Sequence, residues 1–155
     1  MGSVRSNDIT PFLWFNGGIS EAVSLYSEIF ADVQVESTTP AGPESLMSAT
    51  IVINGQRLIL FDGGPYYSFT PAISLFITCS DQDEVDYYWD ALTRDGGEPG
   101  QCGWLTDPFG LSWQVIPDAL GRLMSDPARG GAVRDAMLAM SKIDVAALQA
   151  AFVGA

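Results

Sequence analysis

The first half of the chain alternates between short β-like runs and one amphipathic helical segment. The apolar and aromatic run Ile9–Phe15 predicts a strand that is buried on both faces. From residue 19 to 30, apolar side chains recur every three or four positions, which predicts a helix with one buried face. Three further β-like runs lie at residues 33–39, 46–53 and 56–61. Asn54-Gly55 between the last two is typical of a tight hairpin, so residues 9–62 predict the order β-α-β-β-β.

The same order begins again after a bend rich in glycine and aromatic residues. Ile73–Cys79 predicts a strand, and Asp81 with Glu84 three positions later has the spacing of a helix capping box. The apolar stripe of the following helix ends at a glycine pair. Three β-like segments follow, near residue 101, at residues 103–106 and at residues 111–116. Residues 72–117 therefore predict a second β-α-β-β-β module.

The two predicted helices match at a fixed offset along the chain. Glu21, Ala22, Leu25, Tyr26 and Ile29 fall on Glu84, Val85, Tyr88, Trp89 and Leu92. This favours an internal duplication, although any two amphipathic helices share the same period. We therefore expect a disordered leader at residues 1–8 and paired modules over residues 9–117. Residues 118–155 predict a helical appendage of the same domain, which carries four of the seven basic residues and docks on the core or on a partner subunit.

Composition removes several classes of function. The chain of 155 residues has 19 acidic and seven basic residues, a formal charge of −12, so it is expected to repel nucleic acid. It has no histidine, which excludes Ser-His-Asp and Cys-His nucleophiles, the HExxH zinc site and imidazole acid–base catalysis. No apolar run is long enough for a membrane helix. Two cysteines and the lack of an apolar leader predict a reduced, cytoplasmic protein that does not bind membranes.

Several motifs are distinctive enough to compare with known families. They are Ile9-Thr10-Pro11-Phe12-Leu13-Trp14-Phe15, Phe30, Gly63-Gly64-Pro65, Gln101-Cys102-Gly103-Trp104-Leu105-Thr106-Asp107 and Gly110-Leu111-Ser112-Trp113-Gln114-Val115-Ile116-Pro117. Together they resemble the PhnB-like branch of the vicinal oxygen chelate superfamily, which includes glyoxalases, bleomycin-resistance proteins and dioxygenases. The resemblance implies an α+β fold in which two β-α-β-β-β modules form a curved mixed-sheet cup, followed by C-terminal helices. It also implies a homodimer, and members of this branch often carry the label demethylubiquinone methyltransferase.

Metal-using members of the superfamily take their ligands from the first and last strand of each module. By the resemblance, those positions fall on Thr10 (or Pro11), the window Ile59-Leu60-Phe61, Ser74 and Gln114. Hydroxyl, apolar and amide side chains carry no charge that offsets the desolvation of a divalent cation. We therefore expect neither a metal nor another cofactor in this cup.

The same correspondence predicts which side chains line the cup, because side chains alternate along a strand. The expected lining is aromatic with a few neutral polar groups, a composition common in small-molecule sites. Aromatic residues at strand spacing also fill closed cores, so a plugged cup stays an alternative. The predicted ligand-binding residues are Thr10, Phe12, Trp14, Phe61, Ser74, Phe76, Cys102, Trp104 and Gln114.

Four groups are weighed individually. Gln114 requires partners for its amide, which a ligand, the backbone or Ser74 and Ser112 supply. Cys102 and Cys79 lack a neighbouring cation in the sequence, which favours inert thiols. Asp62 follows a strand and is either a general base or a turn cap. The acidic residues between positions 81 and 90 are interpreted as a solvated helix face.

Three functions stay open at this point. The first is a small-molecule-binding protein or metal-independent enzyme, with no catalytic residue assigned. The second is a methyltransferase acting on a quinone-type substrate, although Gly17-Gly18, Gly63-Gly64, Gly96-Gly97 and Gly130-Gly131 are doublets and no G-x-G-x-G follows a strand. The third is a dimeric scaffold whose cup is filled by its own side chains.

Overall fold

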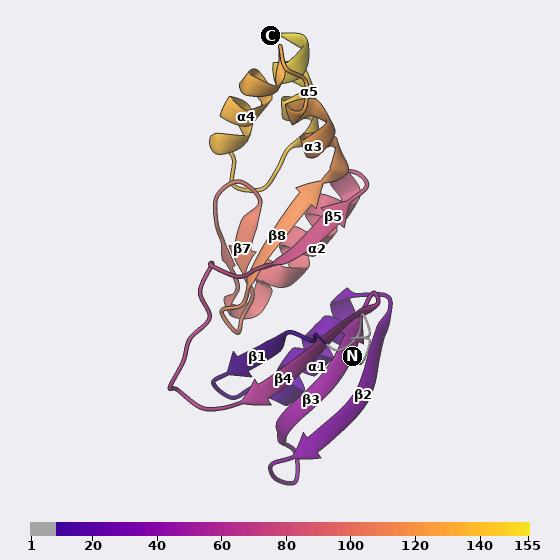
Figure 1. The fold of residues 1–155 in the computed structure, drawn as a ribbon, viewed down its shortest axis with the longest axis vertical. Helices are drawn as coiled ribbons and strands as arrows, with labels where there is room; N and C mark the ends of the chain where they lie inside the picture. The colour runs from indigo at the N-terminus through magenta and orange to yellow at the C-terminus, as the bar shows by residue number, and fades with distance from the viewer. Residues whose placement is uncertain (1–8) are drawn as a thin grey trace, which may run out of the picture. The chain divides into compact units, whose positions relative to one another are not determined.

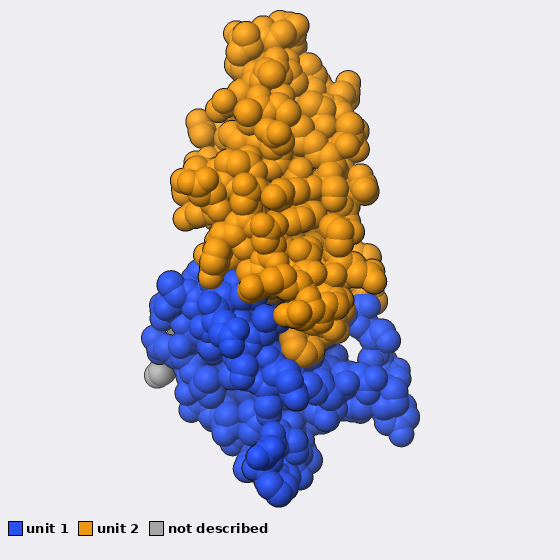
Figure 2. Space-filling view, turned by 180° about the vertical axis from the view of Figure 1, so that it is seen from behind, with its two compact units in different colours: residues 1–69 blue, residues 70–155 orange. Residues whose placement is uncertain are grey.

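A computed structural model describes residues 9–155, so the predicted leader at residues 1–8 lies outside the described part of the chain. The chain divides between Phe69 and Thr70 into two compact units, which Figure 2 shows in different colours. Each unit contains one β-α-β-β-β module.

The first unit consists of one four-stranded sheet and one helix (Figure 1). Its sheet has the order β1-β4-β3-β2, in which β1 runs parallel to β4 and the other neighbours are antiparallel. The elements are β1 (Phe12–Phe15), α1 (Ile19–Ile29), β2 (Val33–Pro40), β3 (Leu46–Ile53) and β4 (Gln56–Asp62). The predicted order for residues 9–62 is confirmed.

Local sequence accounts for most of this unit. The apolar stripe of α1 buries Ile19, Ala22, Tyr26 and Ile29, and the helix packs on β3 and β4. The predicted hairpin is present because Asn54 and Gly55 both have positive φ, 47° and 85°, the backbone that a two-residue turn of this type requires.

The prediction that the first strand is buried on both faces is wrong. Leu13 and Phe15 are buried on the same side as α1, whereas Phe12 on the opposite side is 57% exposed. A continuous apolar run therefore does not distinguish a strand covered on two faces from a strand whose second face carries exposed aromatic rings.

The second unit repeats this architecture and adds three helices. Its sheet has the order β5-β8-β7-β6, with β5 parallel to β8. The elements are β5 (Leu75–Cys79), α2 (Gln82–Thr93), the 3₁₀ turn η1 (Arg94–Gly96), β6 (Glu98–Pro99), β7 (Trp104–Thr106) and β8 (Ser112–Pro117). The short strand expected near Gln101 lies two residues earlier, and Gln101 itself is in the turn before β7.

The start of α2 follows the predicted capping pattern. The Asp81 carboxylate accepts a hydrogen bond from the Glu84 backbone N–H at 3.0 Å. In return, the Glu84 carboxylate accepts one from the backbone N–H of Ser80 at 2.7 Å. These bonds satisfy amides that the first helical turn leaves without partners, so the helix begins where the sequence predicts.

The C-terminal helices lie beyond the end of β8 (Figure 1) and share a small core with it. They are α3 (Asp118–Met124), α4 (Gly130–Leu138) and α5 (Val145–Val153). Their core consists of Ile116 from β8 with Leu120, Val133, Ile143 and Leu148. The segment before α5 also contacts α2, where Lys142 Nζ lies 2.8 Å from an Asp86 carboxylate oxygen. These contacts attach the helices to the second module.

The glycine pair that opens α4 provides a test of this packing. A Cβ on Gly131 meets no atom within 4 Å, whereas a Cβ on Gly130 would lie 2.2 Å from the carbonyl oxygen of Met124. Gly131→Ala is expected to raise the free energy of unfolding by about 0.5–1 kcal/mol, because alanine costs less backbone entropy in a helix. Gly130→Ala is expected to lower it by about 1–3 kcal/mol through overpacking. Urea unfolding of both variants measures these changes. Changes of the same sign and size in the two variants would contradict the prediction.

Within residues 9–155, the structure contains five α helices and two four-stranded mixed sheets. The predicted α+β class, with two β-α-β-β-β modules and C-terminal helices, is therefore confirmed. None of the helices in this part of the chain combines the length and hydrophobicity needed to cross a bilayer.

Candidate ligand-binding site

The first unit carries aromatic side chains on the sheet face opposite α1. Alternation along β4 buries Leu58 and Leu60 beneath α1, which turns Ile59 and Phe61 to the other side. The strand register sets Phe12 beside Ile59 and Trp14 beside Phe61. We call these four residues the first aromatic face: Phe12, Trp14, Ile59 and Phe61.

The rings of this face form a connected array. The Phe61 ring centroid lies 5.4 Å from that of Phe12 and 5.3 Å from that of Trp14, with the Trp14 contact close to edge-to-face. Aromatic pairs in such geometries attract beyond the effect of area burial alone. The structure therefore brings together three of the predicted ligand-binding residues.

The Trp14 ring is held in place by the bend that follows β4. The indole Nε1–H donates a hydrogen bond to the carbonyl oxygen of Gly64 at 2.9 Å. The ring also lies so close to Gly63 that a Cβ there would approach the Trp14 ring carbon Cε2 to 2.0 Å. Glycine at position 63 is thus required by a close approach, and the indole has both a steric and a polar restraint.

The Asp62 side chain stabilises the same bend by hydrogen bonds. Its Oδ1 accepts hydrogen bonds from the backbone N–H of Gly17 at 2.8 Å and of Gly64 at 3.2 Å. These contacts link the two glycine turns that follow β1 and β4. Of the two roles considered for Asp62, the geometry supports the turn cap, which positions the backbone that in turn accepts the Trp14 hydrogen bond.

Tyr67 is a contact of this face that the sequence analysis did not assign. Its ring centroid lies 5.0 Å from that of Trp14 at an interplanar angle of 80°, although the side chain is 67% exposed. The aromatic composition of residues 66–69 was the available signal. Composition alone does not show which of these aromatic rings contacts Trp14.

The second unit carries a more polar set on the corresponding strands. Phe76 on β5 and Trp104 on β7 are the register partners of Gln114 on the intervening β8. Gln114 Nε2 donates a hydrogen bond to Ser74 Oγ at 2.9 Å. We call these residues the second aromatic face: Ser74, Phe76, Trp104 and Gln114.

The amide of Gln114 has therefore acquired one of the partners that the sequence suggested. Its neighbour Phe76 is 57% exposed, and the Gln114 side chain is partly buried. Ser112, the other suggested partner, is buried two residues before Gln114 on β8. A Ser–Gln pair offers a neutral hydroxyl and a neutral amide, groups that orient a ligand by hydrogen bonding without adding charge.

Two of the predicted residues lie apart from these arrays. Thr10 precedes β1 and is partly buried. Cys102 is in the turn before β7 with φ of 57°, and its backbone N–H donates to the carbonyl oxygen of Met140 at 2.8 Å. The Cys102 backbone thus connects the second sheet to the segment after α4.

Cys79 belongs to the core of the second unit. The thiol is fully buried, and desolvation, with smaller contributions from Glu84 and Asp81, raises its pKa to about 12. A thiol with such a pKa stays protonated at neutral pH and is a poor nucleophile.

The side chains at the metal positions of the superfamily do not fit a divalent cation. Leu60 lies in the core beneath α1, which leaves Ile59 or Phe61 as the apolar residue on the relevant face. Ser74 and Gln114 are neutral and hydrogen-bond to each other. Among residues 9–155, no cluster of three or more His, Cys, Asp or Glu residues could hold a metal. This donor chemistry offers no anionic ligand, so no chemical step is assigned to a metal.

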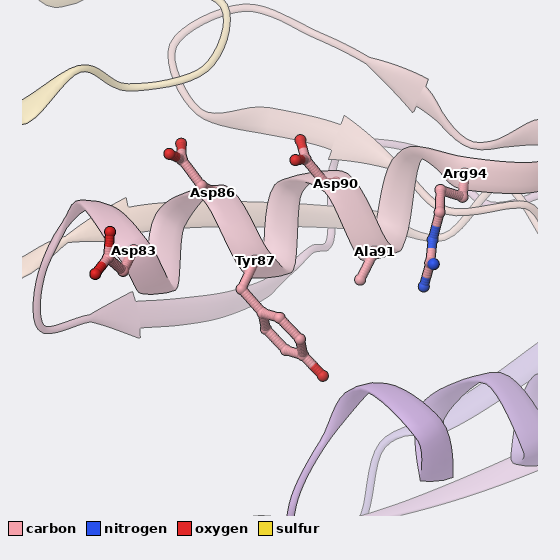
Figure 3. Close-up of a pocket in the computed structure, with 6 residues that line it drawn as sticks. All are labelled: Asp83, Asp86, Tyr87, Asp90, Ala91 and Arg94. Atoms are coloured by element: carbon pink, nitrogen blue, oxygen red, sulfur yellow. The ribbon is translucent and has the colours of Figure 1, made fainter.

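One surface pocket of the second unit lies along α2 (Figure 3). It is lined by Asp83, Asp86, Tyr87, Asp90, Ala91 and Arg94. Hydrogen bonds from Lys142 and then Gln82 lower the pKa of Asp86. The acidic helix face is mostly exposed, as expected, and Asp86 in addition pairs with Lys142 from the segment before α5.

Two sheets built as paired β-α-β-β-β modules define a class of proteins, the vicinal oxygen chelate fold. The family model described as 3-demethylubiquinone-9 3-methyltransferase matches residues 7–116. The chain belongs to this family, the PhnB-like branch of that superfamily. No curated protein matches the chain.

Solved structures agree with this assignment. A Bacillus cereus PhnB protein, described as a candidate 3-demethylubiquinone-9 3-methyltransferase, is 31% identical and superposes with a TM-score of 0.64, covering 72% of this chain and 99% of that protein. A Pseudomonas aeruginosa protein is 26% identical with a TM-score of 0.58, over 72% and 98% of the two chains. A Bacillus cereus protein described as a possible glyoxalase is 16% identical with a TM-score of 0.51, over 72% and 99%, and supports the fold alone.

Proposed function

We propose that this protein binds a small planar organic molecule in a metal-free aromatic cup, on the first aromatic face. The observation that carries this proposal is the array of Phe12, Phe61 and Trp14 on a sheet face that α1 leaves uncovered. Exposing a large aromatic ring costs free energy unless another apolar surface covers it. A flat ligand that stacks on these rings would supply that surface.

The second aromatic face differs from the first in its capacity for hydrogen bonds. The first face has no hydrogen-bonding group among its four side chains apart from the Trp14 N–H, which Gly64 already accepts. The Ser74–Gln114 pair of the second face retains acceptor and donor capacity after its one mutual hydrogen bond. In this proposal the first face suits an apolar ring system, and the second, taken by itself, suits a ring with polar substituents.

The label of the family suggests a second candidate, methyl transfer to a quinone-type substrate. Specific support is limited to that label, because no strand in residues 9–155 is followed by the G-x-G-x-G pattern of a turn that binds a nucleoside-type donor. Homodimerisation and a cytoplasmic location are part of the first proposal, on the basis of the same resemblance. A dimer whose own side chains fill the cup is the non-binding alternative.

A thermal-shift screen with quinones, aromatic drugs and S-adenosylmethionine tests these alternatives. A compound at about 100 times its Kd should stabilise the native state by about 2.7 kcal/mol. Stabilisation by a planar aromatic compound supports the proposed cup. A shift that requires S-adenosylmethionine would favour the methyltransferase, and no shift with any compound would favour the scaffold.

A matched pair of variants then locates the binding site. Phe12→Leu removes an exposed ring of the first aromatic face and is expected to weaken binding of a hit compound about three- to tenfold, the worth of one aromatic contact. Tyr66→Leu removes a ring that is 82% exposed outside this face and should leave the Kd unchanged. Titration calorimetry measures both values. Equal affinity of the two variants would contradict binding at Phe12.

A further inference from the structure

The first unit has an unusual balance of charge around its aromatic face. Residues 9–69 include six acidic residues and one basic residue, Arg57, so their formal charge is 1 − 6 = −5. A protein surface of one sign raises the local concentration of ligands of the opposite sign and lowers that of ligands of the same sign. An anionic ligand of this unit would therefore depend on Arg57 for a positive partner.

Arg57 is positioned next to the first aromatic face. It alternates with Leu58 along β4 and so points to the same side of the sheet as Ile59 and Phe61. Because Phe12 is the register partner of Ile59, Arg57 lies two residues along β4 from the position beside Phe12. By location alone, this guanidinium is a candidate anion-binding group.

The guanidinium of Arg57 already forms an ion pair with Glu36. The Arg57 Nε and Nη2 atoms each donate to a different carboxylate oxygen of Glu36, and both distances are 2.7 Å. Such a bidentate pair uses the planar fork of arginine that would otherwise recognise a carboxylate or phosphate. Glu36 sits at a register shift of β2, between the paired residues Val35 and Ser37. Glu36 is thus the additional residue of a β-bulge, and its carboxylate is the partner of Arg57.

At the opposite end of β4, Asp62 alternates with Phe61 and holds the bend that follows the strand. The Asp62 carboxylate binds the backbone of Gly64, whose carbonyl oxygen in turn binds the Trp14 indole. The faces of aromatic rings also carry negative partial charge and attract cations. Within residues 9–69, the one basic side chain is thus paired with Glu36, while 6 − 1 = 5 further acidic residues and the aromatic rings remain.

We infer that the first aromatic face selects planar aromatic ligands that carry a positive charge over their neutral and anionic counterparts. This inference rests on the proposed function and names the class of its ligand. It excludes phosphorylated and carboxylated aromatic compounds as preferred ligands of this face. The Glu36–Arg57 pair is the positioning element that sets the preference, since it prevents Arg57 from binding an anion.

Three probes with one ring system test the charge preference on the full-length protein. They are 1-methylquinolinium, quinoline and quinoline-6-carboxylate, which at neutral pH carry one positive charge, none and one negative charge. We expect the cation to bind about tenfold more tightly than the anion, with the neutral compound between them, by titration calorimetry. Added salt should reduce the difference, because it screens the charge of the protein.

Two variants test the role assigned to the ion pair. Glu36→Gln leaves Arg57 without its carboxylate, and the affinity for quinoline-6-carboxylate should rise several-fold while that for quinoline stays constant. The double variant Glu36→Gln/Arg57→Gln is the matched control, in which the gain should disappear. Both residues are about one-third exposed, and circular dichroism and the melting temperature establish that the variants are folded.

The outcomes separate this inference from the proposed function. Tighter binding of the neutral or anionic probe, with affinity still reduced by Phe12→Leu, would overturn the charge preference and leave the aromatic site intact. Absence of binding by all three probes, when another aromatic compound binds at Phe12, would also overturn it. If no aromatic compound responds to Phe12→Leu, the proposed function itself fails.

Discussion

Replacing Asp107 by alanine is expected to lower the free energy of unfolding by about 3–5 kcal/mol, because it leaves several buried donors without an acceptor. Asp107 is 1% exposed and begins the turn between β7 and β8. Its carboxylate accepts hydrogen bonds from the backbone N–H of Phe109 at 2.9 Å and of Leu111 at 3.1 Å, and from Trp113 Nε1 at 2.9 Å. Denaturant unfolding measures the loss.

Asp126 provides a matched control for this prediction. Its carboxylate also accepts two backbone hydrogen bonds in a turn, from Ala128 and Arg129, each at 2.9 Å. These bonds lower the pKa of Asp126, with the Arg129 amide as the larger cause. The site is exposed, however, so water replaces the lost acceptor in Asp126→Ala and the destabilisation should be much smaller. Equal losses in the two variants would show that burial at position 107 is not the cause.

Asp107 also shows where sequence analysis stops. The order Asp107-Pro108-Phe109-Gly110 predicts a type I turn, and the hydrogen bond from the Gly110 N–H to the Asp107 carbonyl oxygen at 2.9 Å confirms a β-turn at these residues. The burial of the carboxylate and its bond to Trp113 depend on how the turn packs against the sheet. Those features involve tertiary contacts that a turn pattern does not encode.

Turn and capping residues predict where the helices and hairpins of the modules begin and end. The position of a very short strand is harder to predict. Asn54-Gly55 and the Asp81 cap each act through backbone groups a few residues away, so their effects are visible in the sequence. The strand β6 contains two residues, one of them proline, and pairs with β7 through a short antiparallel ladder. Such a segment has no periodicity, and the expected strand near Gln101 was accordingly misplaced.

The sequence predicts which residues make up the candidate site, but not the contacts that hold their side chains in place. Alternation along β1 and β4 turns Phe12, Trp14 and Phe61 to one side once the strands are known. Likewise, the Ser74–Gln114 hydrogen bond follows from two parallel strands that pair, since it joins residues at nearby register positions. The fit of an indole over a glycine 49 positions away requires the folded backbone, and no pattern of residue types specifies it.

Gly63→Ala is expected to destabilise the protein by about 2–3 kcal/mol and to displace the Trp14 ring, a consequence of overpacking. The added Cβ would lie 2.0 Å from Trp14 Cε2 and 2.1 Å from Trp14 Cζ2, so the indole must move. Moving it breaks the hydrogen bond from Nε1 to the Gly64 carbonyl oxygen and the edge contact with Phe61. Denaturant unfolding measures the loss of stability, and titration of a hit compound measures the accompanying loss of affinity.

A double-mutant cycle with Trp14→Leu tests whether the clash is the cause. The smaller leucine removes the ring atoms that a Cβ at position 63 would meet, so Gly63→Ala should cost less than about 1 kcal/mol in that background, which gives a coupling energy of about 1–2 kcal/mol. An additive cycle would show that alanine acts on the bend itself and not on the indole. In that case the Gly64 hydrogen bond and the contacts with Phe61 and Tyr67 would keep the indole in place, and Gly63→Ala should leave ligand affinity intact.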